Sequence, residues 1–484
     1  MKLNNPELLR SQCLINGEWC DALSGKREAV INPATGAELA SIPLVSEEET
    51  QQAIAAAQRA QNEWKQLTAK QRSALLLAWA DKVLAAQEDL AQLMTAEQGK
   101  SLAEARGEVA YAASFITWFA EEAKRVDGAV LQAPQASQRL VVVKQPIGVC
   151  AAITPWNFPA AMITRKVAPA LAAGCAIIVK PAEQTPLTAL ALAKLAQDAG
   201  IPAGVLQVVT GEAAQVGKVL CDSPVVRKLS FTGSTEVGRI LMAQCAPSIK
   251  KLSLELGGNA PFIVFDDANL DAAVAGIMAS KFRNSGQTCV CANRIYVQDG
   301  IYERLAEKLV AAVEQLKVGD GSQEGTTQGP LIDSDAVAKV QSHIDDALIK
   351  GAQIATGGQP HALGGTFFQP TVVTGVTQKM RFAKEETFGP VAPLFRFHDE
   401  AEAIAMANDT EFGLAAYLFT QNAARQWRVP EALEYGMVGI NTGLISNEVA
   451  PFGGVKQSGL GREGSRYGIE EYLELKYLCI DVSC

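Results

Sequence analysis

Histidine is scarce in this chain of 484 residues, which contains only three: His343, His361 and His398. None stands in an HxxH, HExxH or Cys-His spacing, so the sequence offers no zinc-ligand pattern and few candidates for a histidine-based triad. The ten cysteines are scattered and lack the density of a disulfide scaffold. We therefore expect no metal site and a reducing compartment.

Long apolar runs and an excess of positive charge are also missing. No stretch of eighteen uninterrupted apolar residues occurs, since Arg165 and Lys166 interrupt the most apolar region, and residues 1–6 begin no secretion signal. The 43 basic residues are outnumbered by 52 acidic ones, and the net charge of −9 has the wrong sign for holding a polyanion. These absences predict a cytoplasmic protein that binds neither a membrane nor nucleic acid.

What is present is an ordinary globular composition, 48% hydrophobic and 20% charged, in a length that predicts two to four compact units. Short strands are expected over 13–43. A helix is expected to begin at 46, and two more are expected over 70–94 and 102–124. Short β-branched runs alternate with alanine-rich helical runs over 147–256, and a second such series runs from 261 to about 440. This alternation predicts an α/β fold of doubly wound parallel sheets, which bind ligands at the carboxyl ends of their strands.

Cys289 is the cysteine whose local sequence favours chemistry over packing. A predicted helix over 268–284 is followed by a Gly-Gln-Thr turn that presents the thiol from a loop, where backbone amides can face a developing oxyanion. No histidine is near enough in sequence to serve as its base. Glu255, which ends a predicted strand before Leu256 and two glycines, is the better candidate base, and its alternative is a solvated charge at a strand edge.

Two strand ends in the first α/β series are candidate nucleotide-binding positions. Gly233 and Ser234 join a strand to a helix N-terminus, whose amides and positive dipole end can face a pyrophosphate. The spacing is not G-x-G-x-x-G, so a plain βα turn is the alternative. Lys180 and Glu183 follow another strand, at the place where a ribose would be bound.

Six motifs, taken in order and spacing, resemble the aldehyde dehydrogenase superfamily over nearly the whole chain. They are residues 153–159 (ITPWNFP), 180–183 (KPAE), 231–234 (FTGS), 255–258 (ELGG), 286–289 (GQTC) and 385–390 (EETFGP). Within the superfamily, the chain is most similar to the bacterial succinate-semialdehyde dehydrogenases. The segments that carry this similarity are 163–166 (ITRK), 281–284 (KFRN), 289–293 (CVCAN) and 443–446 (GLIS).

The resemblance implies a thioester mechanism, which agrees with the chemistry of oxidising an aldehyde with a nicotinamide. Cys289 would add to the carbonyl carbon, and the side-chain amide of Asn157 with the backbone amide of Cys289 would bind the oxyanion of the thiohemiacetal. Glu255 would then activate the water that hydrolyses the thioester. For Asn157 the alternative is turn hydrogen bonding before Pro159.

The cofactor implied by the resemblance is NAD or NADP. The implied contacts are Trp156, Lys180, Glu183, Gly233, Ser234, Leu256 and, on the nicotinamide ribose, Glu386, for which a surface acidic pair with Glu385 is the alternative. Bacterial enzymes of this kind that prefer NADP typically carry serine in Lys-Pro-Ala-Ser, where this chain has Glu183. Its carboxylate would accept hydrogen bonds from the NAD ribose and repel the 2′-phosphate of NADP. We therefore expect NAD to be used at least as well as NADP.

The implied substrate is succinic semialdehyde. Arg165, eight residues after Asn157, and Arg283, six before Cys289, would hold its distal carboxylate with Ser446, unless each arginine forms an ordinary salt bridge. The alternatives are glutarate semialdehyde, a broad set of aliphatic aldehydes, or, in another class, a non-redox thiol esterase or binding protein on the same fold.

Cys291 lies two residues past Cys289, as in redox-sensitive members of the resembled family, which makes it a candidate redox partner. A disulfide between the two would consume the nucleophile. The alternative for Cys291 is a small buried residue. The resemblance also implies a homodimer or homotetramer, and each subunit is expected to have three parts. We expect a cofactor-binding domain over 1–125 and 147–256, a catalytic domain over 257–468, and a small β oligomerisation element over 126–146 and 469–484.

Overall fold

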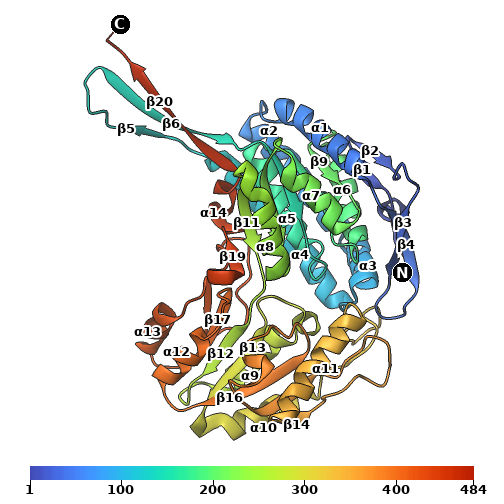
Figure 1. The fold of residues 1–484 in the computed structure, drawn as a ribbon, viewed down its shortest axis with the longest axis vertical. Coiled ribbons are helices and arrows are strands. Elements are labelled where there is room, and N and C mark those ends of the chain that lie inside the picture. Colours follow the sequence, from blue (N-terminus) through green and yellow to red (C-terminus); the bar gives the residue numbers. More distant parts are fainter. Residues whose placement is uncertain (484) are drawn as a thin grey trace.

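A computed structural model describes residues 1–483 as two α/β lobes with a projecting β arm (Figure 1). Each lobe is built around a mostly parallel sheet with helices on both faces, which confirms the predicted fold class. Among the helices of this part of the chain, none combines the length and the apolar character needed to cross a bilayer.

The sheet of the first lobe has eight strands in the order β19-β11-β10-β7-β8-β9-β1-β2. The strands from β11 to β9 are parallel, and β19, β1 and β2 pair antiparallel at the two edges. The strands are β1 (Cys13–Ile15), β2 (Glu18–Cys20), β7 (Val149–Ile153), β8 (Ile177–Lys180), β9 (Leu206–Val208), β10 (Val226–Thr232), β11 (Lys251–Glu255) and β19 (Gly459–Leu460). Because β19 comes from late in the chain, the C-terminal segment crosses back to this sheet. The domain boundaries stay a prediction.

Helices cover both faces of this sheet. One face is covered by α2 (Ala69–Ala85), α3 (Gln87–Gln98), α4 (Leu102–Glu122), α5 (Ala161–Ala173), α6 (Pro186–Asp198) and α14 (Ser465–Glu470). The other carries α1 (Glu47–Trp64), α7 (Ala213–Asp222) and α8 (Thr235–Cys245). Ser46 begins α1 with a capping box to Glu49, which satisfies amide groups that the first helical turn leaves free.

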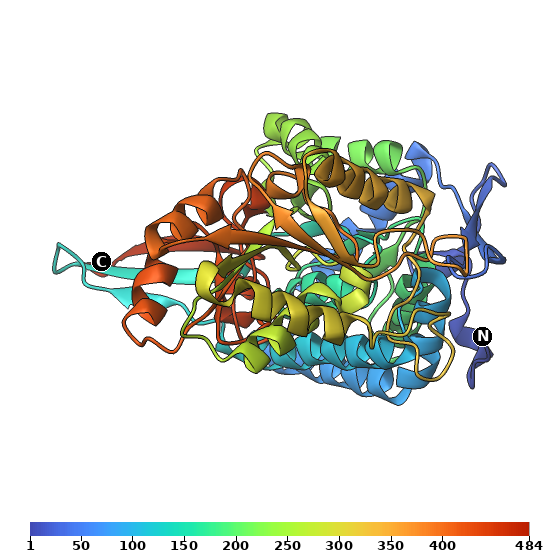
Figure 2. The same cartoon turned by 90° about the horizontal axis from the view of Figure 1, so that it is seen from below.

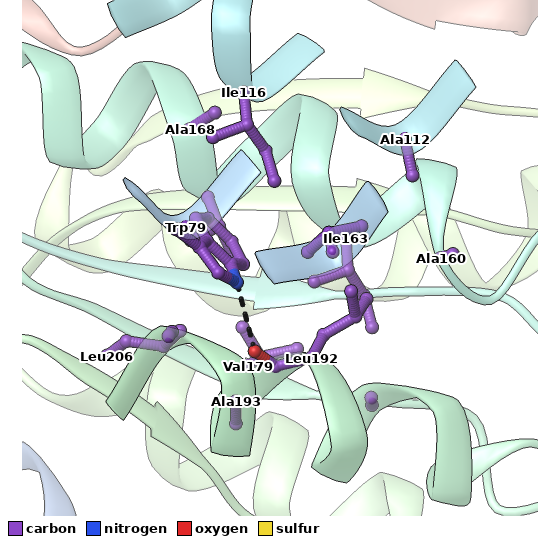
Figure 3. Close-up of a cluster of buried hydrophobic side chains, with 14 of the residues drawn as sticks. Trp79, Ala112, Ile116, Ala160, Ile163, Ala168, Val179, Leu192, Ala193 and Leu206 are labelled. Atoms are coloured by element: carbon purple, nitrogen blue, oxygen red, sulfur yellow. Dashed lines mark hydrogen bonds between the residues drawn. The ribbon is translucent and has the colours of Figure 1, made fainter. Parts of the chain in front are cut away.

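The hydrophobic core of the first lobe holds α4 in position. Trp79 is fully buried, and its indole nitrogen donates to the Leu192 carbonyl at 3.1 Å (Figure 3). Ala112 and Ile116 of α4, four residues apart, share one face of the helix and point into the same core. Truncating a buried tryptophan typically costs about 3–5 kcal/mol, so we regard this packing as a rigid support.

The sheet of the second lobe has seven strands in the order β14-β15-β16-β13-β12-β17-β18, and only β14 pairs antiparallel. The strands are β12 (Ala260–Val264), β13 (Ala292–Gln298), β14 (Gln353–Thr356), β15 (Thr371–Val376), β16 (Val391–Phe397), β17 (Ala415–Phe419) and β18 (Met437–Ile440). One face is covered by α9 (Leu270–Lys281) and α10 (Tyr302–Val313), the other by α11 (Ser334–Ile349), α12 (Glu400–Asn408) and α13 (Arg425–Ala432).

Two small antiparallel sheets complete the fold. A hairpin of β3 (Arg27–Ile31) and β4 (Glu38–Pro43) lies near the N-terminus. The arm consists of β5 (Ala129–Leu131), β6 (Gln138–Pro146) and β20 (Leu473–Asp481), in the order β20-β6-β5. Figures 1 and 2 both show this arm extending from the body on the side away from the N-terminus.

Two predicted helices end differently from expectation. The helical run predicted from 70 to 94 is divided between α2 and α3 at Ala86, whose φ and ψ of −95° and 15° break the helix. The helix predicted over 268–284 stops at Lys281 because Asn284 and Ser285 adopt left-handed φ values of 50° and 54°. Gly286 follows them at φ 76°, and a Cβ there would lie 2.1 Å from the Gly389 carbonyl oxygen. A tight turn therefore replaces the last turn of the helix.

Candidate active site

A cavity of about 340 Å³ opens between the two lobes, and residues of both line it. Eight residues singled out from the sequence lie on its wall: Trp156, Asn157, Gly233, Ser234, Glu255, Leu256, Cys289 and Glu386. Six others do not: Arg165, Lys180, Glu183, Arg283, Cys291 and Ser446. The structure thus brings together residues that are more than 200 positions apart in the chain.

Strand ends place the residues that the first lobe contributes. Glu255 is the last residue of β11 and pairs in register with Thr232, the last residue of β10. The Gly233 amide donates to the Glu255 carbonyl at 3.1 Å, which fixes the turn into α8 beside Glu255. Asn157 follows β7, the next strand of the sheet. The carboxyl ends of parallel strands meet at one edge, which is where this architecture places its ligands.

The left-handed turn after α9 presents Cys289 to the cavity. Gln287 is fully buried and holds the turn, because its side chain donates to the Asn284 carbonyl and accepts from the Ile332 amide at 2.9 Å. The Cys289 thiol is half-buried. Burial, and to a lesser degree Glu386, raises the pKa of Cys289 to about 12, although Arg165 acts in the opposite direction. The thiol is therefore protonated at neutral pH, and a base must remove its proton before it can attack.

Asn157 is held beside this turn by both its backbone and its side chain. Its carbonyl accepts from Lys100 Nζ at 2.8 Å and from Asn284 Nδ2 at 3.0 Å. Its side-chain Nδ2 donates to the Gln287 carbonyl at 3.0 Å. The amide is therefore a fixed donor bonded to Gln287, which is two residues before Cys289. It can stabilise an oxyanion only if the oxyanion replaces the Gln287 carbonyl as its acceptor.

Glu255 is buried, and neither of its carboxylate oxygens has a hydrogen-bond partner within residues 1–483. Burial is the main cause that raises the pKa of Glu255 well above its ordinary value. Glu463 adds to the shift, while Arg165 and Lys166 oppose it. Gly453 makes room for the carboxylate, since a Cβ there would lie 2.9 Å from Glu255 Oε1. A carboxyl group in this setting can hold and release a proton near the operating pH.

A buried ion cluster lies behind Glu255. Arg165 Nε lies 2.6 Å from Glu463 Oε2, and Lys166 contacts the other Glu463 oxygen and donates to Thr232 Oγ1 at 2.6 Å. The Phe452 ring packs 4.0 Å from the Arg165 guanidinium. Arg165 therefore forms an internal salt bridge, which the sequence leaves open as the alternative to substrate binding. Its Nη2 has no hydrogen-bond partner in the described chain. Its role toward a substrate stays a prediction.

The wall opposite the thiol has the features of a dinucleotide site. Ser234 caps α8 by accepting from the Val237 amide, so the free amides of the first helical turn open beside Gly233. A Cβ on Gly233 would lie 2.4 Å from the Phe231 ring, which explains the glycine. Across the cavity, Glu386 Oε1 accepts from the Gly258 amide at 3.2 Å, and burial raises the pKa of Glu386 to about 7. These residues fit a nicotinamide dinucleotide.

Lys180 and Glu183 lie at the end of β8, outside the cavity wall. Lys180 Nζ lies 2.8 Å from Glu183 Oε2, and Lys180 is buried while Glu183 remains partly exposed. Burial raises the pKa of Glu183, but the stronger combined effect of the Lys180 charge and hydrogen bond lowers it below its ordinary value. Glu183 is therefore ionised at neutral pH. The pair presents a carboxylate whose negative charge is partly compensated.

A second cavity, of about 570 Å³, contains Arg283 and Ser446 on its wall. The Arg283 guanidinium packs 4.8 Å from the Phe158 ring and, among the described residues, forms no ion pair within 4.0 Å. Tyr111 lies on the same wall. Thr288, the residue before Cys289, donates from Oγ1 to the Arg283 carbonyl at 3.5 Å. The second cavity, with its uncompensated cation, therefore lies beside the turn that presents the thiol.

Cys291 is fully buried and makes no bond to Cys289. Its thiol lies 3.4 Å from the Gly286 carbonyl and 3.6 Å from the Lys281 carbonyl. A disulfide with Cys289 would require the Cys291 side chain to leave these partners, and the redox role stays a prediction.

Sequence reasoning missed several residues that line the two cavities or contact residues of the site. Glu463 stands in a Gly-Arg-Glu-Gly segment, where a charged pair between glycines was the available signal. Lys339 lines the first cavity from α11, and Lys100 lies against Asn157 from the turn before α4. Tyr111 lies in a helix whose pattern indicates only which face is buried.

Comparison with known proteins identifies one family. A protein-family model described as "Aldehyde dehydrogenase family" matches residues 19–478 of this chain. The chain is 65% identical over 480 residues, 99% of this chain and 100% of the relative, to an Escherichia coli protein named succinate-semialdehyde dehydrogenase, NADP(+). It is also 65% identical over 482 residues, 100% of both chains, to a glutarate-semialdehyde dehydrogenase of Pseudomonas putida. A 3-sulfolactaldehyde dehydrogenase of Pseudomonas putida is 64% identical over 480 residues, 99% of both chains.

Solved structures give the same result. A succinate-semialdehyde dehydrogenase from Burkholderia pseudomallei matches with a TM-score of 0.99 and 64% identity over 100% of both chains. A betaine aldehyde dehydrogenase from Staphylococcus aureus in complex with NAD+ matches with a TM-score of 0.96 and 36% identity, covering 98% of this chain and 96% of that chain. The family expected from the six motifs is confirmed.

Proposed function

Because the chain belongs to the aldehyde dehydrogenase family, we propose that it oxidises succinic semialdehyde to succinate with NAD+ or NADP+ as the oxidant. The observation that carries the choice of substrate is Arg283, a guanidinium without a carboxylate partner in residues 1–483, on a cavity close to Cys289. A short aldehyde that ends in a carboxylate matches this arrangement of cation and thiol.

Cys289 provides the nucleophile. Its thiol proton passes to a base, for which Glu255 is the candidate, and the sulfur then bonds to the aldehyde carbon while the carbonyl π electrons move onto oxygen. The Asn157 amide and the Cys289 backbone amide donate to that oxyanion. The nicotinamide, when bound, supplies the acceptor for the hydride that leaves this carbon.

Once the thiol proton has passed from Glu255 to solvent, the Glu255 carboxylate completes the reaction by taking a proton from water. The water oxygen attacks the thioester carbon while the bond from that carbon to Cys289 breaks and leaves the thiolate. General-base catalysis of this kind is worth roughly 10²–10⁴-fold. The unpartnered, buried carboxyl group of Glu255 supports this role, because no competing hydrogen bond in the described structure engages its oxygens.

The cofactor contacts in this proposal are Trp156, Gly233, Ser234, Leu256 and Glu386 around the first cavity, with Lys180 and Glu183 at the adenosine ribose. Both nicotinamide dinucleotides are accepted in this scheme. The ionised Glu183 favours NAD at least as much as NADP, because a carboxylate accepts hydrogen bonds from ribose hydroxyls and repels a phosphate.

Glutarate semialdehyde is a second candidate substrate. Its support is the Pseudomonas putida relative, which is named for that substrate and is as identical to this chain as the Escherichia coli protein. Both substrates end in a carboxylate, so the role proposed for Arg283 is the same for either and only the length of the carbon chain differs.

We also propose that the arm joins two copies of this chain. Three apolar side chains on it are widely exposed: Val130 at 78%, Leu475 at 69% and Tyr477 at 57%. An exposed apolar surface on a projecting sheet is typical of an interface, and a homodimer or homotetramer would cover it. Sedimentation of the purified protein distinguishes these assemblies from a monomer.

The substrate proposal is tested with succinic semialdehyde, glutarate semialdehyde and butanal, each with NAD+ and NADP+, followed as nicotinamide absorbance. Arg283→Ala should raise the KM for succinic semialdehyde by about tenfold or more, since tenfold corresponds to about 1.4 kcal/mol of binding, and should change butanal little. Arg304→Ala, an exposed arginine on α10, is the matched control. Equal effects on both aldehydes would remove the carboxylate-holding role. Ester hydrolysis without nicotinamide, and no aldehyde oxidation, would instead identify a thiol esterase.

A further inference from the structure

Tyr111, on α4, has a buried hydroxyl that the proposed reaction does not use. Its oxygen is inaccessible to solvent and has no hydrogen-bond partner in residues 1–483. Two other buried tyrosines have bonded hydroxyls: Tyr302 donates to the Leu394 carbonyl at 3.1 Å and Tyr417 to the Val290 carbonyl at 2.8 Å. Buried polar groups in proteins are usually paired, so an unpaired hydroxyl on a residue that lines a cavity is suited to a partner that arrives with a ligand.

The surroundings of Tyr111 indicate the charge of that ligand. Tyr111 shares the wall of the second cavity with Arg283 and Ser446. Burial raises the pKa of the Tyr111 hydroxyl, and the charges of Arg165 and Arg283 act in the opposite direction. A phenol that shares a cavity wall with a guanidinium group and a serine hydroxyl belongs to a set of donors suited to an anion.

One acidic residue, Glu104, also lines this cavity. Its oxygens are already engaged: Oε1 accepts from the Asn284 amide at 2.7 Å and Oε2 from Ser101 Oγ at 3.2 Å. Glu104 therefore stabilises the turn after α9 and the start of α4, and it does not satisfy the Tyr111 hydroxyl or form an ion pair with Arg283.

The position of the Tyr111 hydroxyl is set by a rigid element. The next residue, Ala112, and Ile116 anchor α4 in the core of the first lobe (Figure 3). The Phe115 ring meets the Tyr111 ring edge to face, with centroids 4.9 Å apart. A donor on a packed helix loses little conformational entropy on binding, which is what a specificity contact requires.

We propose that the Tyr111 hydroxyl donates a hydrogen bond to the distal carboxylate of the semialdehyde, alongside Arg283 and Ser446. This inference rests on the function proposed above. Three segments, α4, the turn after α9 and the loop containing Ser446, then each supply one donor to the same anion. A site whose donors, including the buried Tyr111 hydroxyl, all pair with the carboxylate disfavours an aldehyde that ends in a methyl group, because that aldehyde leaves them unpaired.

The test is Tyr111→Phe, which removes one oxygen and keeps the ring. We expect the kcat/KM for succinic semialdehyde to fall by about tenfold, mostly through KM, while the kcat/KM for butanal changes by less than about twofold. Tyr467→Phe, which removes the hydroxyl of an exposed tyrosine, is the matched control. Unchanged melting temperature and cofactor affinity would show that the variant is folded.

A double variant provides a readout that a structural role would not move. If Tyr111 and Arg283 bind the same carboxylate, Tyr111→Phe should cost less in an Arg283→Ala background than in the wild type. Equal loss with succinic semialdehyde and butanal, or no loss with either, would overturn the inference. A wild-type enzyme that shows no preference for semialdehydes over butanal would instead overturn the function on which the inference rests.

Discussion

Arg165 and Glu463 form a buried ion pair, with Nε 2.6 Å from Oε2, whereas Arg283 has no carboxylate within 4.0 Å in the described chain. The two arginines, both predicted from the sequence to bind the distal carboxylate, therefore differ in whether their charge is compensated. The charge of Arg165 is compensated by Glu463, and separating that pair would leave a buried charge unpaired, which is costly. We therefore expect substrate recognition to depend mainly on Arg283, with a smaller contribution from Arg165 through its unpartnered Nη2.

Glu255→Gln should slow the hydrolysis of the thioester more than its formation, because the Cys289 thiol is a stronger acid than water and can also lose its proton to solvent. The variant cannot accept a proton from water, so we expect a pre-steady-state burst of reduced nicotinamide followed by a steady state about 100-fold below wild type. Stopped-flow absorbance measures both phases. Glu48→Gln, on the exposed side of α1, is the control. Steady-state turnover equal to wild type would place the base elsewhere.

The pH dependence of wild-type turnover follows from the same carboxyl group. Burial and Glu463 raise the pKa of Glu255, so its basic form is lost as the pH falls and gains population as the pH rises. We expect kcat to increase as the pH rises. Glu255→Gln should lack this limb in its deacylation step, and the same limb in the variant would assign it to another group.

Glu386 should make cofactor affinity depend on pH. Burial raises its pKa to about 7, so the carboxylate is ionised above that pH and protonated below it. The ionised form accepts hydrogen bonds from ribose hydroxyls at both oxygens, and we therefore expect the Kd for NAD+ to rise as the pH falls from 8 to 6. Quenching of Trp156 fluorescence without aldehyde measures Kd alone. A Kd that varies equally in Glu386→Gln would count against this role.

Motifs at strand ends made most of the site predictable. Glu255, Gly233 and Asn157 each follow or end a parallel strand, and the rule that such ends share one edge brings them together without coordinates. The hydrophobic periodicity of α4 and the capping box of α1 likewise indicate their helices from local sequence alone.

Local sequence does not predict contacts between residues that are far apart in the chain. Glu463 contacts Lys166 across 297 positions, and the sequence near either residue does not indicate this partner. The left-handed turn at Asn284 depends on space left by Gly286 against the Gly389 backbone, which is a tertiary contact. Whether the Tyr111 hydroxyl has a hydrogen-bond partner depends on residues that surround it in the fold, and the helical pattern of the sequence does not indicate this.

Oxidation should inactivate the enzyme reversibly through Cys291. Peroxide would convert the Cys289 thiolate to a sulfenic acid, and the Cys291 thiol would displace water from it to form a disulfide that dithiothreitol reduces. We expect activity to return after reduction in the wild type, but not in Cys291→Ala, where further oxidation is irreversible. Cys479→Ala, at an exposed cysteine, is the control. Identical behaviour of wild type and Cys291→Ala would exclude the pairing.

The choice between NAD and NADP should depend on the pair formed by Lys180 and Glu183. Because Lys180 Nζ lies 2.8 Å from Glu183 Oε2, the cation that could bind a 2′-phosphate is already occupied by a carboxylate. A phosphate about 4 Å from Glu183 would meet a repulsion of about 1 kcal/mol per unit charge at the dielectric constant of water, and more in a partly buried site. We expect NAD+ to be used at least as well as NADP+, although the Escherichia coli relative is named for NADP(+).

Glu183→Ser should free Lys180 from its ion pair and raise the ratio of kcat/KM for NADP+ to kcat/KM for NAD+ by about tenfold. The doubly charged 2′-phosphate would no longer be repelled by the Glu183 carboxylate and could pair with Lys180. Glu183→Gln is the matched variant: it removes the charge and keeps the size, so a comparable shift would assign the effect to charge, and a small one to the space that serine opens. Initial rates over both cofactor concentrations, at saturating aldehyde, give the ratios. A wild-type kcat/KM for NADP+ tenfold above that for NAD+ would show that Glu183 does not face the ribose, because a carboxylate in that position cannot favour the phosphorylated cofactor.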